Sequence, residues 1–251
     1  MGSTVSGVGT RAEVMAALHD ASARFIELAA AVTPSDAARP VPPLEWTVGE
    51  TIGHVLTVIR RGYRDPRRSA TPEETAGLNQ ICLDELEERD PAALAELLRA
   101  DVHTALDLVY PKIADDRVFP FHGGVETTMT PALHVVLGEF LIHGYDVARA
   151  LDQPWEISEA DAHLMVPGEL MGAWLRADAP DERYELRLGE HEPIGFAIHD
   201  GTLVVGDAAA LVAGDVGVVA MPTLEMVLTF YGRIPAEDPV LQRLLSRFVP
   251  S

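Results

Sequence analysis

The sequence predicts an α+β protein of two domains, a four-helix bundle followed by a small α+β domain. Three observations support this prediction. Apolar residues recur at helical spacing through the first 150 residues, whereas short strand-like runs occur only after Pro154. A chain of 251 residues also has room for two domains of roughly 100–200 residues each.

The first half predicts helices joined by loops. The stretches with helical patterns are 11–32, 47–64, 72–88, 91–109 and 130–151. Pro34 stops the first of them, and Thr47 with Glu50 forms a capping-box signature at the start of the second. The last opens at Thr130-Pro131, with a start as early as Val125 as the alternative. Long amphipathic helices of this kind are the ingredients of a four-helix bundle.

After Pro154 the pattern predicts a mixed domain. The expected elements are a helix near 158–175, strands at 184–188, 194–198, 202–205 and 216–220, and helices ending near 231 and 248. The junction His199-Asp200-Gly201 indicates a hairpin turn between two of these strands. We therefore expect a flexible leader over 1–10, a bundle domain over 11–153 and an α+β domain over 154–251.

The charge of the chain excludes several kinds of partner. Acidic residues outnumber basic ones by 39 to 19, which gives a net charge of −20. Such a field repels phosphate backbones and anionic lipid head groups, so we expect neither nucleic acid nor a membrane as partner. Because no targeting segment or apolar run of ~20 residues is present, we expect a cytoplasmic protein.

The most informative local pattern is Glu139-x-x-x-His143 in the last helix of the expected bundle. The two residues lie about 40° apart on one helical face, and Asp146 shares that face. A carboxylate and an imidazole at this spacing can chelate one divalent metal ion. The alternative is an ordinary contact on a helix surface. Asp146 would either orient a ligand or bind a neighbouring arginine.

His54 stands in the middle of an otherwise apolar helix. A lone histidine in such a place can be a core residue with a satisfied hydrogen bond, but bundles also build metal sites from ligands on facing helices. His54 with Glu139 and His143 would form a two-histidine, one-carboxylate site with an open position for water or substrate. Spacing alone leaves open whether the two helices face each other.

An arginine run at 60–68 interrupts the acidic character of the chain. Five of these nine residues are arginines, which can complement a helix C-terminus or pair with surface acids. Arg61, however, follows His54 by seven residues and returns to the same helical face about 10 Å further along. We therefore name Arg61 as a candidate for binding a substrate carboxylate.

The remaining cysteine and histidines are weaker candidates. Cys82, the only cysteine, excludes an intramolecular disulfide and a multi-cysteine zinc site, and we expect it to be a buried structural thiol. His122, in a glycine-containing loop, is placed at the mouth of a pocket. His134 lies about 140° away from the expected ligand face. We interpret the other histidines as surface or packing residues.

The segments 46–56 (WTVGETIGHVL) and 139–148 (EFLIHGYDVA) resemble the DinB-like, mycothiol-dependent maleylpyruvate isomerase family. The C-terminal half is similar to the second domain of that family, which is distantly similar to sterol-carrier proteins. The resemblance implies a DinB-like four-helix bundle with His54, Glu139 and His143 as metal ligands, usually for zinc. Through the segment Tyr231-Gly232-Arg233, it also implies a functional role for Arg233.

The resemblance implies zinc and mycothiol as cofactors. Coordination to Zn²⁺ deprotonates a thiol. In the isomerase reaction, thiolate adds to a conjugated cis double bond, the new single bond rotates, and thiolate leaves to give the trans product. Mycothiol is an actinobacterial thiol, in agreement with eighteen arginines against one lysine, Lys112.

We therefore predict a metal-dependent isomerase or S-transferase that acts on a small electrophile, which would be carboxylated if Arg61 binds it. Two alternatives remain. One is a small-molecule binding protein without catalysis, and the other is a metal-independent enzyme on the same scaffold in natural-product metabolism, with His54 or Glu139 as acid or base.

Overall fold

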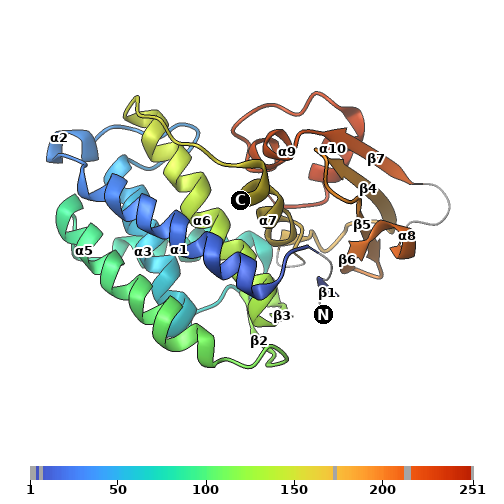
Figure 1. Ribbon diagram of the computed structural model, residues 1–251, viewed down its shortest axis with the longest axis horizontal. Helices are drawn as coiled ribbons and strands as arrows, with labels where there is room; N and C mark the ends of the chain where they lie inside the picture. Colours follow the sequence, from blue (N-terminus) through green and yellow to red (C-terminus); the bar gives the residue numbers. More distant parts are fainter. Residues whose placement is uncertain (1–3, 6–7, 172–173, 212–215, 250–251) are drawn as a thin grey trace.

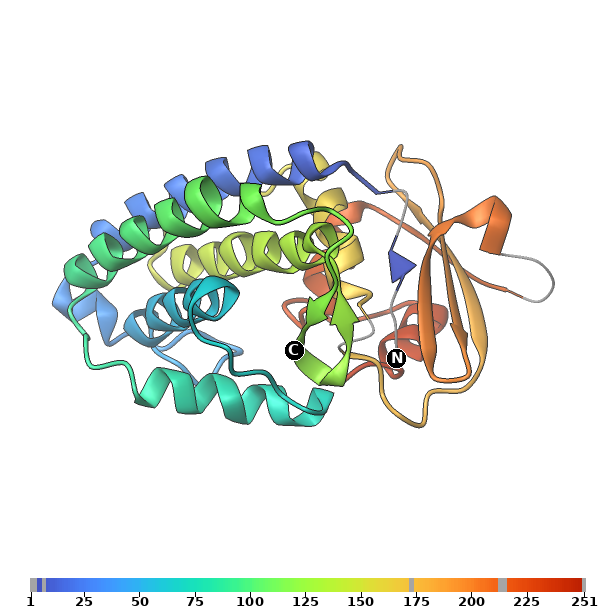
Figure 2. The same ribbon diagram turned by 90° about the horizontal axis from the view of Figure 1, so that it is seen from below.

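Four helices form a closed bundle in the N-terminal part of the computed structural model, which describes residues 4–5, 8–171, 174–211 and 216–249. The helices are α1 (Arg11–Ala30), α3 (Val48–Tyr63), α5 (Pro91–Val102) and α6 (Met129–Ala150). Helices α1 and α3 each pack against both α5 and α6, as Figures 1 and 2 show. The predicted four-helix bundle is thereby confirmed.

Helix α3 illustrates why these sequences form the bundle. Ile52, Val55, Leu56 and Ile59 recur at helical spacing and are fully buried against the neighbouring helices. The helix begins where the sequence predicts, because Thr47 and Glu50 form the expected capping box. This start fixes the rotation of the helix, so His54 lies on its buried face.

Short elements connect the bundle helices. They are α2 (Pro34–Ala37), η1 (Pro72–Glu74), α4 (Thr75–Asp84), the π-helical turns η2 (His103–Val109), η3 (Tyr110–Lys112), β2 (Phe119–Pro120), η4 (His122–Gly124) and β3 (Glu126–Thr127). Helix α4 packs against α3. Strands β2 and β3 pair antiparallel and form a separate two-stranded sheet.

Several expected boundaries were wrong. An extension of α6 upstream to Val125 does not occur, since Glu126–Thr127 is held in extended backbone by pairing with β2. The helix expected over 72–88 is limited to η1 and α4, and the one expected over 91–109 changes to π-helical turns after Val102. The helix near 158–175 ends at Glu169, and residues 172–173 of that prediction lie outside the described residues.

The C-terminal part is built on a five-stranded sheet. The helices and strands of this part are, in order along the chain, α7 (Glu159–Glu169), β4 (Glu182–Leu188), β5 (Ile194–His199), β6 (Thr202–Asp207), α8 (Ala208–Leu211), β7 (Gly217–Met221), α9 (Thr223–Phe230) and α10 (Pro239–Leu245). The strand order is β1-β6-β5-β4-β7, with β4 antiparallel to β5 and parallel to β7. Asp200 and Gly201 both have positive φ in the tight β5–β6 turn, so the expected hairpin is confirmed.

The expected leader over 1–10 contains a strand of this sheet. Strand β1 (Thr4–Val5) pairs in parallel with β6, at Thr4↔Val204 and Val5↔Val205. Val8 is buried, and Thr10 caps α1 in a second capping box. Backbone pairing and capping thus order this part of the segment, whereas residues 1–3 and 6–7 lie outside the described residues.

Helix α6 ends in a well-defined stop signal. Asp152 adopts a positive φ of 57°, and the N–H of Gln153 donates to the carbonyl of Ala148 at 2.8 Å. This is the Schellman pattern, and Pro154 follows it directly. We propose the boundary between the two domains at this point, between residues 153 and 154.

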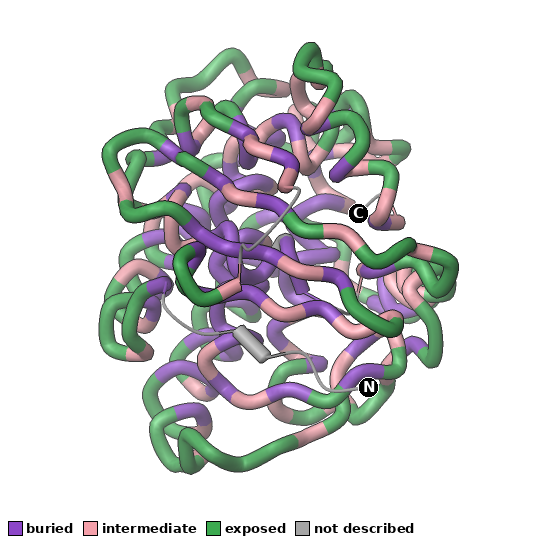
Figure 3. The backbone as a smooth tube through the Cα atoms, turned by 90° about the vertical axis from the view of Figure 1, so that its right-hand side faces the viewer, coloured by how far each residue is buried: buried purple, intermediate pink, exposed green. Residues whose placement is uncertain are grey.

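The two parts nevertheless share one hydrophobic core. Buried residues from α1 to Phe248 form a single cluster, and α7 packs against both α6 and α9. Figure 3 shows buried residues, in purple, along the strands at the sheet end of the molecule. Among the described residues, no helix is long and apolar enough to cross a membrane.

The capping box of α3 should contribute measurably to stability. Thr47→Ala removes the hydroxyl that accepts from the Glu50 N–H, so we expect the free energy of unfolding to fall by about 1 kcal/mol. Urea unfolding monitored by circular dichroism measures the change. Thr47→Ser keeps the acceptor and is the control. Equal stability of the alanine and serine variants would contradict the assigned cap.

Candidate functional site

Three side chains of types that can ligate a metal ion converge where α3 faces α6. His54 Nε2 lies 3.1 Å from Glu139 Oε2, and His143 Nε2 lies 3.3 Å from the same oxygen. His54 is nearly fully buried, whereas Glu139 and His143 retain partial exposure. The structure therefore brings together the three residues that were expected to be ligands, and it answers whether the two helices face each other.

The geometry of these three side chains is compatible with a shared metal ion. One ligand atom from each residue lies within 4.8 Å of the others. Two ligands bonded at 2.0–2.1 Å to a tetrahedral zinc ion are about 3.3 Å apart, which is close to the two separations found here. Two imidazoles and one carboxylate also match the donor sets of catalytic zinc sites, which keep a fourth position open. The residues present thus fit a divalent ion.

Burial and mutual contacts shift the pKa values of this cluster. Burial lowers the pKa of His54, and the contact with Glu139 offsets only part of that effect. Burial alone would raise the pKa of Glu139, but its contacts with His143 and His54 hold that pKa well below its usual value. Glu139 is therefore an ionised carboxylate, the form that can bind a cation.

Asp146 connects His143 to the C-terminal domain. Its Oδ2 lies 3.2 Å from His143 Nδ1, and the guanidinium of Arg233 donates to both carboxylate oxygens, at 2.9 and 2.6 Å. Asp146 and Arg233 are almost completely buried. Because an ionised carboxylate only accepts, His143 carries a proton on Nδ1 and turns Nε2 towards Glu139. Burial alone would lower the pKa of His143, yet Asp146 and Glu139 raise it to about 9.

Arg233 comes from the turn after α9, within the expected Tyr231-Gly232-Arg233 segment. Besides its two bonds to Asp146, its guanidinium donates to the carbonyl of Tyr231. Gly232 adopts a positive φ of 71°, a conformation that favours glycine. The tight turn thus directs an arginine of the second domain onto a carboxylate of the bundle.

A cavity of about 140 Å³ opens beside the cluster, between the two parts of the chain. Its walls are mainly apolar, and they include Trp46 from the bundle and Trp174, Phe230 and Tyr231 from the second domain. The indole of Trp46 packs on the ring of His54, with 4.5 Å between ring centroids. Packing orients His54, whereas hydrogen bonding orients His143.

Arg61 does not contact the three candidate ligands directly. It lies on the buried face of α3, as expected from its spacing to His54, and lines a smaller cavity that it shares with Glu139. His122 lines the same small cavity. It is buried there, and it lines this smaller cavity rather than the larger one beside the cluster.

The other candidates lie outside the cluster. Cys82 is buried in α4, where burial raises the pKa of its thiol, as a structural role requires. His134 is buried and hydrogen-bonds through Nδ1 with the carbonyl of Leu164. His199 joins an exposed group with Asp181 and Asp200 at the β5–β6 turn. A nucleophilic sulfur in the described site would therefore have to come from a bound molecule.

Sequence reasoning missed two features of this site. It named Arg233 and Asp146 separately, and only the spacing of Asp146 three residues after His143 signalled that the aspartate belongs there. It gave Trp46 no role, although this residue stands directly before the capping box of α3. The missing information is tertiary, because residues 146 and 233 are 87 positions apart.

These features define a class of two-domain proteins in which a helical bundle carries two histidines and a carboxylate, and a small α+β domain supports them. This chain belongs to the family described as mycothiol maleylpyruvate isomerase N-terminal domain, whose model matches residues 18–148, just over half of its length. A comparison with curated proteins finds no match.

Two solved structures have the same fold. One is the crystal structure of the mycothiol-dependent maleylpyruvate isomerase, with a TM-score of 0.51 and 15% identity over 88% of this chain and 89% of that one. The other is a histidine-to-alanine mutant of the mycothiol-dependent maleylpyruvate isomerase, with a TM-score of 0.50 and 14% identity over the same shares. At these identities the likeness establishes the two-domain fold.

The buried pair of Asp146 and Arg233 should be strongly coupled. Asp146→Leu or Arg233→Met alone leaves one buried charge without its partner, which costs about 3–5 kcal/mol of unfolding free energy. The double variant should cost clearly less than the sum of the two single variants. A double-mutant cycle from urea unfolding measures this coupling.

The exposed pair of Arg39 and Asp152 provides a matched control, because it also joins distant parts of the chain at 2.9 Å. The double-mutant cycle for this control pair should give a coupling energy of less than about 1 kcal/mol. Additive costs for Asp146 and Arg233 would contradict the assigned pair.

Proposed function

We propose that this protein is a zinc-dependent, mycothiol-dependent isomerase or S-transferase that acts on a small electrophile. The observation that carries the proposal is the convergence of His54, Glu139 and His143 within 4.8 Å beside a cavity. Membership of the mycothiol maleylpyruvate isomerase family supports the thiol cofactor and the class of reaction. The two structural neighbours are described as mycothiol-dependent maleylpyruvate isomerase, which favours isomerisation of a related substrate.

In this proposal His54, Glu139 and His143 hold the metal ion. When bound, the ion keeps a coordinated thiol in its thiolate form, the nucleophile that thiol-dependent isomerisation and S-transfer both require. Glu139 supplies the negative charge of the ligand set, and the two neutral imidazoles supply nitrogen donors. Two residues of the same helix and one of the facing helix thus determine where the thiol sulfur is held.

The remaining residues position the ligands and exclude water. Asp146 accepts from His143 Nδ1 and so directs Nε2 towards Glu139, where it would bind a metal ion after losing its proton, and Arg233 fixes Asp146. We therefore propose Arg233 as a positioning residue that acts through Asp146. Trp46 fixes the ring of His54, while Trp174 and Phe230 provide apolar walls that favour a desolvated electrophile.

The cytoplasmic location remains a prediction.

The metal proposal is tested directly by zinc content. We expect purified protein to bind one equivalent of zinc, and His54→Ala, Glu139→Gln and His143→Ala to weaken binding by more than the 10–100-fold typical of lost outer-shell partners. Competition with a chromophoric chelator measures the affinity. His103→Ala removes an exposed histidine and should leave zinc binding unchanged. Protein that stays zinc-free after incubation at neutral pH would contradict the proposal.

The thiol proposal is tested with zinc-loaded protein and mycothiol. We expect mycothiol to raise the melting temperature of the zinc-loaded protein, because a ligand that binds only the folded state stabilises it. S-methylated mycothiol, which has no ionisable thiol, should raise it much less. If neither compound shifts the melting temperature at millimolar concentration, the protein does not use this thiol. Shifts that are equal with and without zinc would favour a metal-independent role.

A further inference from the structure

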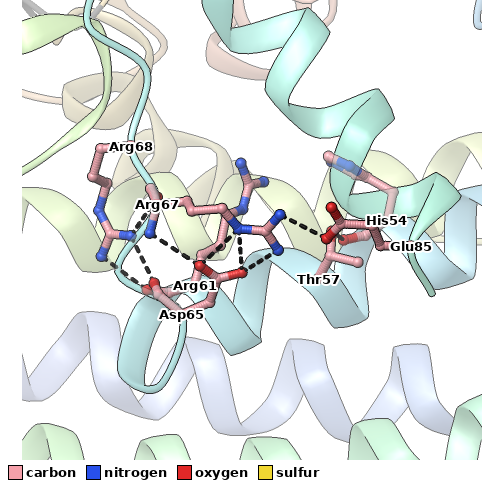
Figure 4. A network of polar contacts seen from close by, with 7 residues as sticks. All are labelled: His54, Thr57, Arg61, Asp65, Arg67, Arg68 and Glu85. Carbon is pink, nitrogen blue, oxygen red and sulfur yellow. Dashed lines mark hydrogen bonds and ion pairs between the residues drawn. The ribbon is translucent and has the colours of Figure 1, made fainter.

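Four of the five arginines in the run at 60–68 have partners. The partners are Asp101 for Arg60 and Arg64, Asp65 and Glu85 for Arg67, and backbone carbonyls of residues 61, 65 and 67 for Arg68. Figure 4 shows the contacts of Arg67 and Arg68. For these four residues the simple interpretation of the run, local charge pairing and helix capping, is sufficient.

Arg61 is the exception. Its residue is only 4% exposed, and its Nε and Nη1 are buried without a hydrogen-bond partner among the described residues. No dashed line in Figure 4 reaches its guanidinium. Burial lowers the pKa of Arg61, and the charges of Glu139 and Asp65 offset that effect only in part. A buried guanidinium with unsatisfied N–H groups is costly, and a bound anion would satisfy them. An arginine cannot escape this cost by losing its proton under ordinary conditions.

Arg61 lines a cavity of about 70 Å³ that adjoins the candidate metal site. Glu139, Asn79 and Trp174 line both this cavity and the larger one of about 140 Å³. The two spaces therefore meet at the same walls. A ligand that spans both spaces would place one end beside Arg61.

Two neutral polar side chains stand in the walls beside Arg61. His122 Nδ1 accepts a hydrogen bond from the Ser69 N–H at 3.3 Å, so the ring proton lies on Nε2, a donor. Burial lowers the pKa of His122 to about 3, so its ring is uncharged. Asn79 Oδ1 is buried without a partner, but this atom is an acceptor and does not bind a carboxylate. The wall thus offers His122 Nε2 as a donor beside Arg61, and Glu139 is the one carboxylate among its described lining residues.

We propose that the small cavity is an anion subsite in which Arg61 binds a carboxylate of the substrate. This inference rests on the proposed function for the reaction at the neighbouring site, but the anion subsite itself does not depend on a metal ion. It makes Arg61 the residue that selects for a carboxylate at this end of the substrate. That carboxylate forms charge-assisted hydrogen bonds with Arg61, and the reacting carbons lie towards Glu139.

The charges of the two adjoining cavities support this assignment. Arg61, Arg68 and Arg233 balance the carboxylates of Glu73, Glu139 and Asp146, and the ligand histidines are neutral when they bind a metal. A divalent ion therefore leaves an excess of two positive charges. One thiolate and one substrate carboxylate neutralise that excess, whereas an uncharged substrate would leave a net charge in an apolar cavity.

Binding of succinate to metal-free protein tests the subsite without any catalytic activity. We expect calorimetry to detect succinate binding to the wild-type chain, and Arg61→Met to weaken it by about 10–100-fold, the loss of one charged hydrogen-bonded contact. Arg61→Lys keeps the positive charge but loses the two parallel N–H donors of the guanidinium. Its affinity for succinate should therefore lie between those of the wild type and Arg61→Met. Succinamide, the neutral counterpart of succinate, should bind weakly to all variants.

Arg64→Met is the matched control, because it removes one charge from the same run at a half-exposed position paired with Asp101. It should leave succinate binding unchanged. Equal weakening in Arg61→Met and Arg64→Met, or none in either, would overturn the inference. Arg61→Met should change thermal stability little, since, within the described part of the chain, no hydrogen bond to Nε or Nη1 is broken. A clear loss of thermal stability would show a structural arginine and would also overturn the inference.

His122→Phe provides a second variant that leaves Arg61 in place. We expect it to weaken succinate binding several-fold, and unchanged binding would remove His122 from the subsite and count against the inference. Failure of the two proposals is distinguishable. Succinate binding that depends on Arg61 in a protein that never binds zinc would support the subsite and contradict the proposed function. Binding of zinc and mycothiol, together with succinate binding that does not depend on Arg61, would support the proposed function and contradict the anion subsite.

Discussion

The buried carboxylate of Asp146 is the interaction on which the arrangement of the site depends. It accepts from His143 on one side and from the guanidinium of Arg233 on the other, so it joins a candidate metal ligand to the second domain. Either charge alone at this depth would cost about 3–5 kcal/mol of unfolding free energy. The bundle can therefore keep His143 oriented only while the α9 turn is docked, and correct docking of the two domains becomes a condition for a correctly formed cluster.

Much of the fold could be predicted because its signals are local. The capping box at Thr47, the helical spacing of apolar residues in α3 and the Asp200-Gly201 turn each act within a few residues, and the structure confirms all three. The wrong boundaries have non-local causes. Residues 126–127 are extended because β2 pairs with them, and no pattern within the helix signals that pairing. Strand β1 is the extreme case, since its partner lies at the other end of the chain.

In the candidate site, too, local features could be predicted from the sequence and long-range contacts could not. The placement of Glu139 and His143 on one face of α6 follows from helix geometry alone, whereas the approach of His54 needed a resemblance to a known family. The pairing of Arg233 with Asp146 could not be derived from residues so far apart. The sequence also does not distinguish the five arginines of the run at 60–68. In the structure four have hydrogen-bond or ion-pair partners, whereas Nε and Nη1 of Arg61 have none among the described residues. Only the burial of each side chain separates Arg61 from its neighbours.

Strand β1 has a consequence for how the chain reaches this structure. Thr4 and Val5 are made first, yet they pair with Val204 and Val205, about 200 residues later. Closing a loop of that length costs entropy that only a late, largely assembled state can repay. Until then β6 would present an open edge, which is the kind of surface through which sheets of separate molecules join. In the folded chain Thr4 and Val5 occupy part of that edge, so a strand of another molecule would have to displace them before it could pair there.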